Sequence, residues 1–113
     1  MKLPEEGMLL RIFIGESDVF QDRALYEQIV LKARELNLAG ATVTRGLMGF
    51  GADSRIHTVK LLRLSEDLPV IIEIVDTEEK LNTLLPFLDE VVQEGLITLE
   101  KVRVIKYRHS QSK

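Results

Sequence analysis

The glycine-rich stretch 40–51 holds the residue types most suited to bind a ligand. Gly46, Gly49 and Gly51 fall within six residues. Glycine permits positive φ and close backbone approach, and successive amides in such a turn can form an anion-binding nest. A phosphate-contacting loop is one interpretation, and a bulged strand end with a tight turn is the other. Because no Lys-Ser/Thr pair follows in P-loop spacing, Walker chemistry is excluded.

Two further polar groups are candidates for ligand or metal binding. His57 beside Thr58 is either a phosphate or metal ligand or an ordinary hydrogen-bonded strand histidine. Residues 16–18, Glu-Ser-Asp, either coordinate a cation or form a solvated turn. No nucleophile has a base at a recognisable spacing, so we expect no catalytic residue and no enzymatic activity. Cysteine is absent, which excludes thiolate sites, and we predict no metal site.

Length and composition indicate one domain over residues 1–113, with 1–7 and 108–113 as flexible ends. The net charge of −3 argues against a nucleic-acid binder, which needs a basic surface to displace counterions. No apolar run approaches the roughly 20 residues of a membrane-spanning helix, so we expect no membrane insertion. The N-terminus lacks the pattern of a signal peptide, and we therefore expect a cytoplasmic protein.

The candidate residues lie on alternating strands and helices. Asp22 is expected to cap the first helix, Asp76 and Glu79 have capping-box spacing for the second, and Pro86 should kink that second helix. The apolar periodicity predicts, in order, a strand over 8–15, a helix over 22–36, a strand over 41–48, extended runs over 56–64 and 69–75, a helix over 77–92, and a last strand or strand pair over 96–107.

This order predicts an α+β fold, a ferredoxin-like βαββαβ sandwich with an extended hairpin. Two helices can cover only one face of its sheet. Yet residues 70–75 place Val70, Ile72 and Ile74 on one face and Ile71 and Val75 on the other. A second apolar face implies a second partner, and we expect it to be another copy of the chain. A buried edge or an extra strand is the alternative explanation.

The sequence resembles PII signalling proteins. Residues 40–44, Gly-Ala-Thr-Val-Thr, followed by Gly-Phe-Gly at 49–51, are similar to the strand and T-loop start of that family. His57-Thr58 and Leu68–Val75 resemble the pattern on the far side of the T-loop.

A still closer resemblance is to small prokaryotic PII-like proteins grouped as domain of unknown function 190. Residues 10–18 and 55–65 are typical of that group, and the resemblance covers about residues 8–106. Several separated motifs in the same order carry it.

The resemblance implies a homotrimer that binds ATP, ADP or AMP in clefts between subunits. It also implies a T-loop that contacts a partner protein, such as a transporter or an enzyme. Carried over by position, the residues expected at the nucleotide are Thr42, Gly49, Phe50, Gly51, His57, Gly95, Arg103 and Lys106.

Several positions depart from the PII pattern. The turn at 93–96 has one glycine and an acid where PII proteins have two glycines and a lysine. Arg103 and Lys106 are three residues apart, which places them on opposite faces of a regular strand. The loop after Gly51 is short, and Leu61-Leu62 stands where PII proteins carry a modifiable Leu-Tyr. We therefore expect no uridylylation.

Three alternatives remain open. One is a metal-binding trimer of the CutA type, with His57 and acidic residues as ligands. Another is a small-molecule enzyme on the same fold, because fold does not fix function. An RNA-binding domain fits worst, since the predicted central strands lack stacking aromatics and the charge is negative.

Overall fold

The computed structural model describes residues 6–50 and 67–108, so the expected strand over 56–64 lies outside the described residues. The first strand begins at Glu6, two residues before the predicted start. The elements are β1 (Glu6–Gly15), β2 (Val19–Phe20), β3 (Arg23–Ala24), α1 (Leu25–Glu35), β4 (Thr42–Arg45), β5 (Pro69–Asp76), α2 (Glu78–Asn82), α3 (Leu85–Val91) and β6 (Leu96–Arg103).

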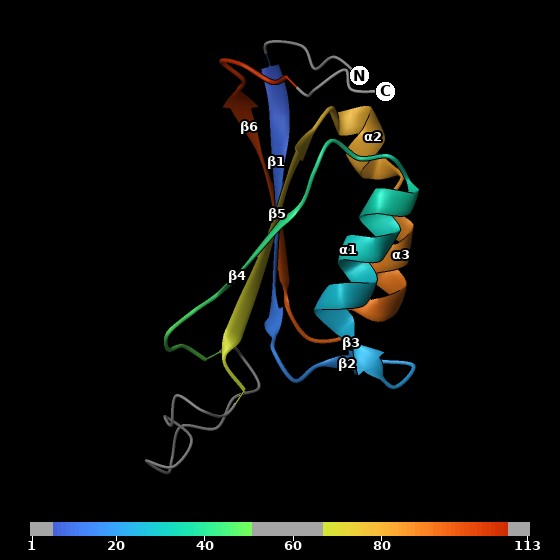
Figure 1. Ribbon diagram of the computed structural model, residues 1–113, viewed down its shortest axis with the longest axis vertical. Helices are drawn as coiled ribbons and strands as arrows, with labels where there is room; N and C mark the ends of the chain where they lie inside the picture. The colour runs from blue at the N-terminus through green and yellow to red at the C-terminus, as the bar shows by residue number, and fades with distance from the viewer. Residues whose placement is uncertain (1–5, 51–66, 109–113) are drawn as a thin grey trace.

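Four strands form one antiparallel sheet in the order β4-β5-β1-β6. The central strand β1 pairs through residues 8–15 with the whole of β5 on one side, and through residues 6–13 with the whole of β6 on the other. The helices α1, α2 and α3 form a second layer on one face of this sheet (Figure 1). The ferredoxin-like α+β architecture expected from the sequence is confirmed.

The core lies between the sheet and the helices. Strands β1 and β5 supply alternate residues to it, because successive side chains of a strand point to opposite faces. The apolar side chains buried there are Leu10, Ile12 and Ile14 from β1, Val70, Ile72 and Ile74 from β5, and Leu25, Ile29, Ala33, Leu81, Leu84, Leu88 and Val91 from the helical layer. Burial of this apolar area supplies the main driving force for folding.

No helix formed by residues 6–50 and 67–108 lies over the opposite face of the sheet, here called the open face (Figure 1). Phe13 and Ile71 are register partners on this face and are only partly buried. At its centre Arg11 Nε donates to Glu73 Oε2 at 2.7 Å, and Arg11 Nη1 donates to Glu100 Oε1 at 3.2 Å. The hydrogen bond to Glu73, with added attraction from Glu100, raises the pKa of Arg11 above its usual value. The open face is thus apolar with a paired charge cluster across three strands.

The expected N-cap of the first helix is wrong. Gln21 and Asp22 have φ of 55° and 66° and form the two-residue turn of the β2–β3 hairpin. Positive φ at both central residues is the requirement of such a turn, and Asp tolerates it. Helix α1 consequently begins only at Leu25, and its N-cap residue Ala24 makes no side-chain cap.

The expected kink in the second helix is a complete break between α2 and α3. Pro86 lies in the first turn of α3, where its missing N–H would have no intrahelical partner anyway. The capping residue is Thr77, whose Oγ1 accepts from Lys80 N at 3.2 Å, and not Asp76 as predicted. Asp76 is fully buried instead, and its carboxylate accepts from Ala39 N at 2.8 Å and Thr77 N at 2.7 Å.

Replacing Asp76 by Ala should destabilise the fold. The change leaves the N–H groups of Ala39 and Thr77 without their acceptor, so the free energy of unfolding should fall by about 2–4 kcal/mol. Urea denaturation measures this loss in the free energy of unfolding. Asp89 is an exposed aspartate on α3, and Asp89→Ala, as the matched control, should stay within about 0.5 kcal/mol of the wild type. Equal losses in the two variants would show that Asp76 is not a structural acceptor.

Candidate functional site

An open cavity of about 820 Å³ lies at the end of the sheet where β1 begins and β5 ends. Its walls come from parts of the chain that are distant in sequence. Leu9 of β1 and Glu73 and Val75 of β5 form the floor, residues 39–42 form one side, and residues 102–107 form the other. The floor residues belong to the open face.

Three of the residues expected at the nucleotide line this cavity. Thr42 is the first residue of β4 and pairs with Glu73, whereas Arg103 is the last residue of β6. Lys106 joins them, although strand alternation placed it on the face opposite Arg103. The difference arises because β6 ends at Arg103 and the chain bends at Ile105, so the period of two no longer applies.

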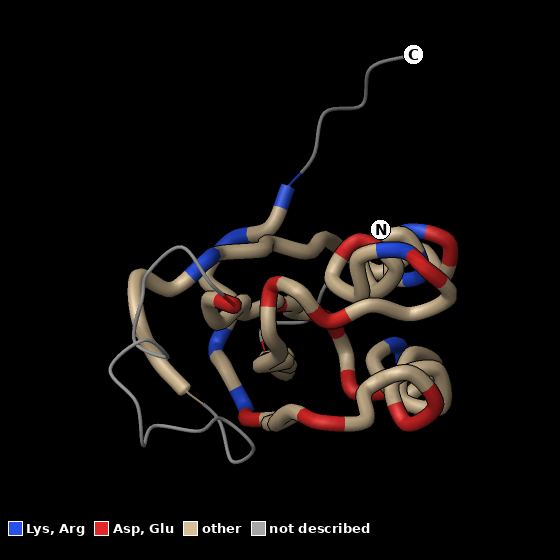
Figure 2. Tube along the Cα trace, turned by 90° about the horizontal axis from the view of Figure 1, so that it is seen from below, with Lys and Arg blue, Asp and Glu red and all other residues tan. Residues whose placement is uncertain are grey.

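The cavity has a cationic side and an acidic floor. Residues 101–108 contain lysines and arginines and no acid, and they follow one another along the C-terminal stretch in Figure 2. Glu73 on the floor is neutralised in part by Arg11, whose Nε lies 2.7 Å from it. Val75 and Ile105 add apolar surface. Such a cavity suits a ligand with both an anionic group and a flat apolar part.

The expected loop residues Gly49 and Phe50 lie at the other end of the sheet. Gly46 N donates to the carbonyl oxygen of Pro69, the first residue of β5, at 2.7 Å. A Cβ on Gly49 would lie 3.1 Å from Pro69 Cγ, so both glycines allow the chain to pass close to this proline. Among residues 6–50 and 67–108 no glycine has positive φ, and so Gly46 and Gly49 do not form the nest considered above. Gly51 and His57 lie outside the described residues.

Gly95 lies at this second end too. A Cβ at position 95 would lie 2.6 Å from the carbonyl oxygen of Phe13, so close packing alone explains why this residue is glycine. The register partners of Arg103 and Leu96 are Glu6 and Phe13, seven residues apart on β1. That separation corresponds to about 23 Å of strand. Within one chain, those expected site residues that the structure describes therefore form two groups at opposite ends of the sheet.

Sequence reasoning missed Tyr107. It was assigned to the last strand without a role, yet it lines the cavity, and its Oη donates to the carbonyl oxygen of Ala39 at 3.0 Å. The available signal was a single aromatic residue within a stretch of basic and aliphatic residues, 101–108.

The polar turn after β1 has internal partners. Glu16 Oε2 accepts from Arg45 at 3.0 Å, and Asp18 Oδ2 accepts from Gly15 N at 3.0 Å. Within the described ranges no three His, Cys, Asp or Glu side chains gather in a way that could hold a metal ion. In the same part of the chain no helix is long and apolar enough to cross a membrane.

Comparison with known proteins identifies relatives along nearly the whole chain. The family model DUF190, described as "Uncharacterized ACR, COG1993", matches residues 7–104. A UPF0166 protein of Aquifex aeolicus is 43% identical over 99 residues, covering 86% of this chain and 91% of that protein. A UPF0166 protein of Methanocaldococcus jannaschii is 38% identical over 102 residues, covering 89% and 94%.

Among solved structures, the fold is shared with CPII of Thiomonas intermedia K12, a nitrogen regulatory PII-like protein. The structure of CPII bound to ADP and bicarbonate superimposes with a TM-score of 0.62 at 16% identity, covering 89% of this chain and 90% of that one. At this identity the likeness establishes a PII-like fold.

Gly95→Ala should destabilise the fold whether or not a ligand binds there. The added methyl group would meet the Phe13 carbonyl oxygen, and relief requires a backbone shift that costs about 1–3 kcal/mol of unfolding free energy. Gly40→Ala is the control, because its Cβ would meet nothing within 4 Å. That variant should be neutral or slightly stabilising. Urea denaturation of both compares them, and a neutral Gly95→Ala would remove the packing explanation.

Proposed function

The chain belongs to the DUF190 family, and we propose that it is a PII-like regulatory protein which binds an adenine nucleotide between copies of itself. One observation carries the proposal. Thr42, Arg103 and Lys106, which sequence resemblance assigned to a nucleotide, line a single cavity although they are up to 64 residues apart. The related fold of CPII, solved with ADP, supports the same ligand class.

The chemistry of the cavity fits a nucleoside phosphate. The Arg103 guanidinium presents a planar set of donors for phosphate oxygens, and the Lys106 ammonium adds a compact positive charge. The Thr42 hydroxyl can donate or accept at the opposite wall. The apolar surface of Val75 and Ile105 can pack against the face of an adenine ring. ATP, ADP and AMP share these features.

A cleft between two copies of the chain would explain why the expected site residues lie in two separate groups within one copy. Arg103 stands at one end of the sheet, and Gly49 and Gly95 stand at the other. A head-to-tail arrangement brings opposite ends of neighbouring protomers together, and a ring closed by three such contacts is the homotrimer that the resemblance to PII proteins implies. The open face, which carries Phe13 and Ile71, is the apolar surface that such packing would bury.

The loop after β4 is the proposed contact with a partner protein, a transporter or an enzyme. Leu47, Met48 and Phe50 at the start of this loop are 83%, 63% and 65% exposed. Exposed apolar side chains grouped in this way are typical of interaction sites. Regulation by binding, and not catalysis, is the role proposed for the chain.

Self-association should depend on the open face. Light scattering should give three times the chain mass for the wild type, and Ile71→Lys should shift the mass toward that of a monomer, because it places a charge in the buried interface. Leu31 is a matched control, since it is an apolar residue on α1 with 54% exposure. Leu31→Lys should leave the mass unchanged. A wild-type chain that is monomeric would overturn the cleft arrangement.

Nucleotide binding should depend on Arg103. Calorimetric titration with ADP should show binding to the wild type, and Arg103→Ala should weaken it by about 1.5–3 kcal/mol, or roughly 10- to 150-fold, since a charge-assisted bond to phosphate is lost.

Lys101 provides the control for a general effect of charge. It lies two residues earlier on β6, is exposed, and is not part of the cavity wall. Lys101→Ala should change the ADP affinity less than threefold at about 0.15 M salt, because an exposed charge outside the cavity wall is weakened by solvent and salt and makes no direct bond to the ligand. Equal losses for Lys101→Ala and Arg103→Ala would remove Arg103 from the site. Binding of divalent metal ions without any nucleotide would favour the CutA-like alternative.

A further inference from the structure

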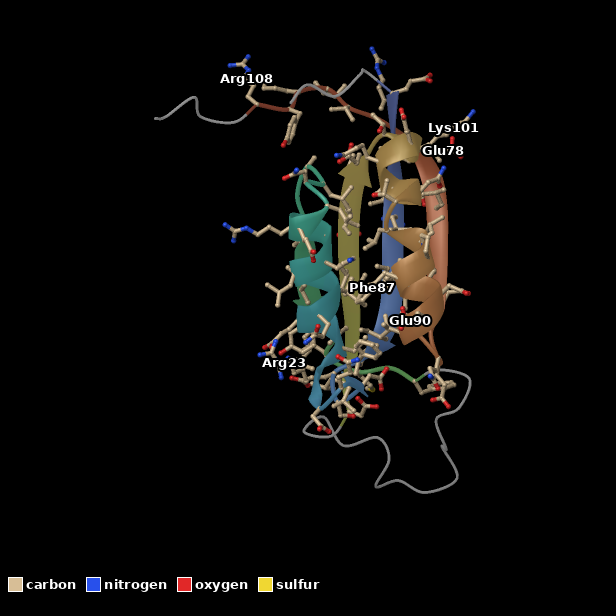
Figure 3. All side chains as sticks on the ribbon, turned by 90° about the vertical axis from the view of Figure 1, so that its right-hand side faces the viewer. Arg23, Glu78, Phe87, Glu90, Lys101 and Arg108 are labelled. Carbon is tan, nitrogen blue, oxygen red and sulfur yellow. The ribbon has the colours of Figure 1, made fainter. Side chains whose placement is uncertain are left out.

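The segment Val104–Arg108, here called the strap, crosses the end of the sheet after β6. It leaves the edge strand β6, runs along one side of the cavity and reaches the turn between α1 and β4. Figure 3 shows this path above the strands, with Arg108 labelled at its far end. The strap carries Lys106 and forms one wall of the cavity.

The strap is fastened by the side chain of Tyr107. Its Oη donates to the carbonyl oxygen of Ala39 at 3.0 Å. The N–H of Ala39 in turn donates to Asp76 Oδ2 at 2.8 Å, and Asp76 is fully buried, with its other oxygen accepting from Thr77 N. The Tyr107 hydroxyl therefore connects the strap to a fixed point in the core.

Apolar burial does not hold the strap in place at its centre. Ile105 is 81% exposed, and β6 ends at Arg103. Lys106 adjoins Tyr107, so their Cα atoms are about 3.8 Å apart and the anchor restricts where the Lys106 ammonium can reach. Without it, ordering the long Lys106 side chain on a ligand would cost additional conformational entropy.

We propose that Tyr107 is a positioning residue, whose hydroxyl holds the strap so that Lys106 faces a phosphate group in the cavity. This inference rests on the proposed function, because it concerns the same cavity. Tyr107 acts through Lys106 and the strap and need not itself touch the ligand.

The first test follows the strap in the protein without nucleotide. Tyr107→Phe removes only the hydroxyl, and it should raise hydrogen exchange of the amides in residues 104–108 while the rest of the described core stays protected. Tyr26 is the other tyrosine of the chain and lies on α1, so Tyr26→Phe is the matched control. That variant should leave exchange of the strap unchanged.

The second test is a double-mutant cycle on ADP affinity, measured by calorimetry. Tyr107→Phe should weaken binding by about three- to tenfold, as expected for one lost hydrogen bond. Lys106→Ala should then cost clearly less in the Tyr107→Phe background than in the wild type, because the two residues act as a unit. In the Tyr26→Phe background the full cost of Lys106→Ala should remain.

The outcomes separate this inference from the function on which it rests. A wild-type chain that binds no adenine nucleotide overturns both. If the wild type binds ADP, unchanged strap exchange in Tyr107→Phe overturns the anchoring role alone. Additive effects of Tyr107→Phe and Lys106→Ala likewise overturn the positioning role while leaving the nucleotide site intact.

Discussion

The structure depends on one mismatch: its sheet has two apolar faces, and its helices cover only one. The side chains of β1 and β5 that face the helices are almost completely excluded from solvent. The alternate side chains, such as Phe13 and Ile71, are only partly buried within the chain. Because exposed apolar area is costly in water, the second face favours association, and the proposed trimer would cover it.

The charge cluster on the open face is compatible with such a partner. Arg11 stands between Glu73 and Glu100, so its guanidinium has carboxylates on both neighbouring strands. Burying a lone charge would oppose association, whereas a charge that is already paired and hydrogen-bonded costs less to desolvate. Because its charges and hydrogen bonds have fixed directions, the cluster also favours one alignment between protomers over others. A uniform apolar surface does not. Glu73 belongs both to this cluster and to the cavity floor, so Arg11 contacts a residue that lines the cavity.

The architecture could be predicted from the sequence, because the periodicity of apolar residues in the strands and helices determines it. The prediction failed where a local turn or a side-chain hydrogen bond overrides that periodicity. Alternation in β1 and β5 predicted the sheet and its two faces. Asp22 was assigned as a cap, but the hairpin turn used it at positive φ. Asp76 was predicted as the helix cap, one residue before the actual cap, Thr77. Its carboxylate instead accepts a hydrogen bond from the N–H of Ala39, which is 37 residues away in the sequence. For the site, resemblance placed Thr42, Arg103 and Lys106 at one ligand, but alternation did not anticipate the bend at Ile105.

In the proposed trimer, the location of the cavity at one end of the sheet is relevant to regulation. A ligand held by one protomer alone would not sense its neighbours. Here the cationic group around Arg103 and the glycine group around Gly95 lie at opposite ends of β1, so only adjoining protomers supply both. A ligand in such a seam binds the assembly more tightly than the separated chains, and by linkage it stabilises that assembly. In the proposed trimer, Gly49 and Phe50 of each protomer would lie at the same seam. Occupancy of the cavity is therefore coupled, in the proposed trimer, to the surface offered to a partner protein.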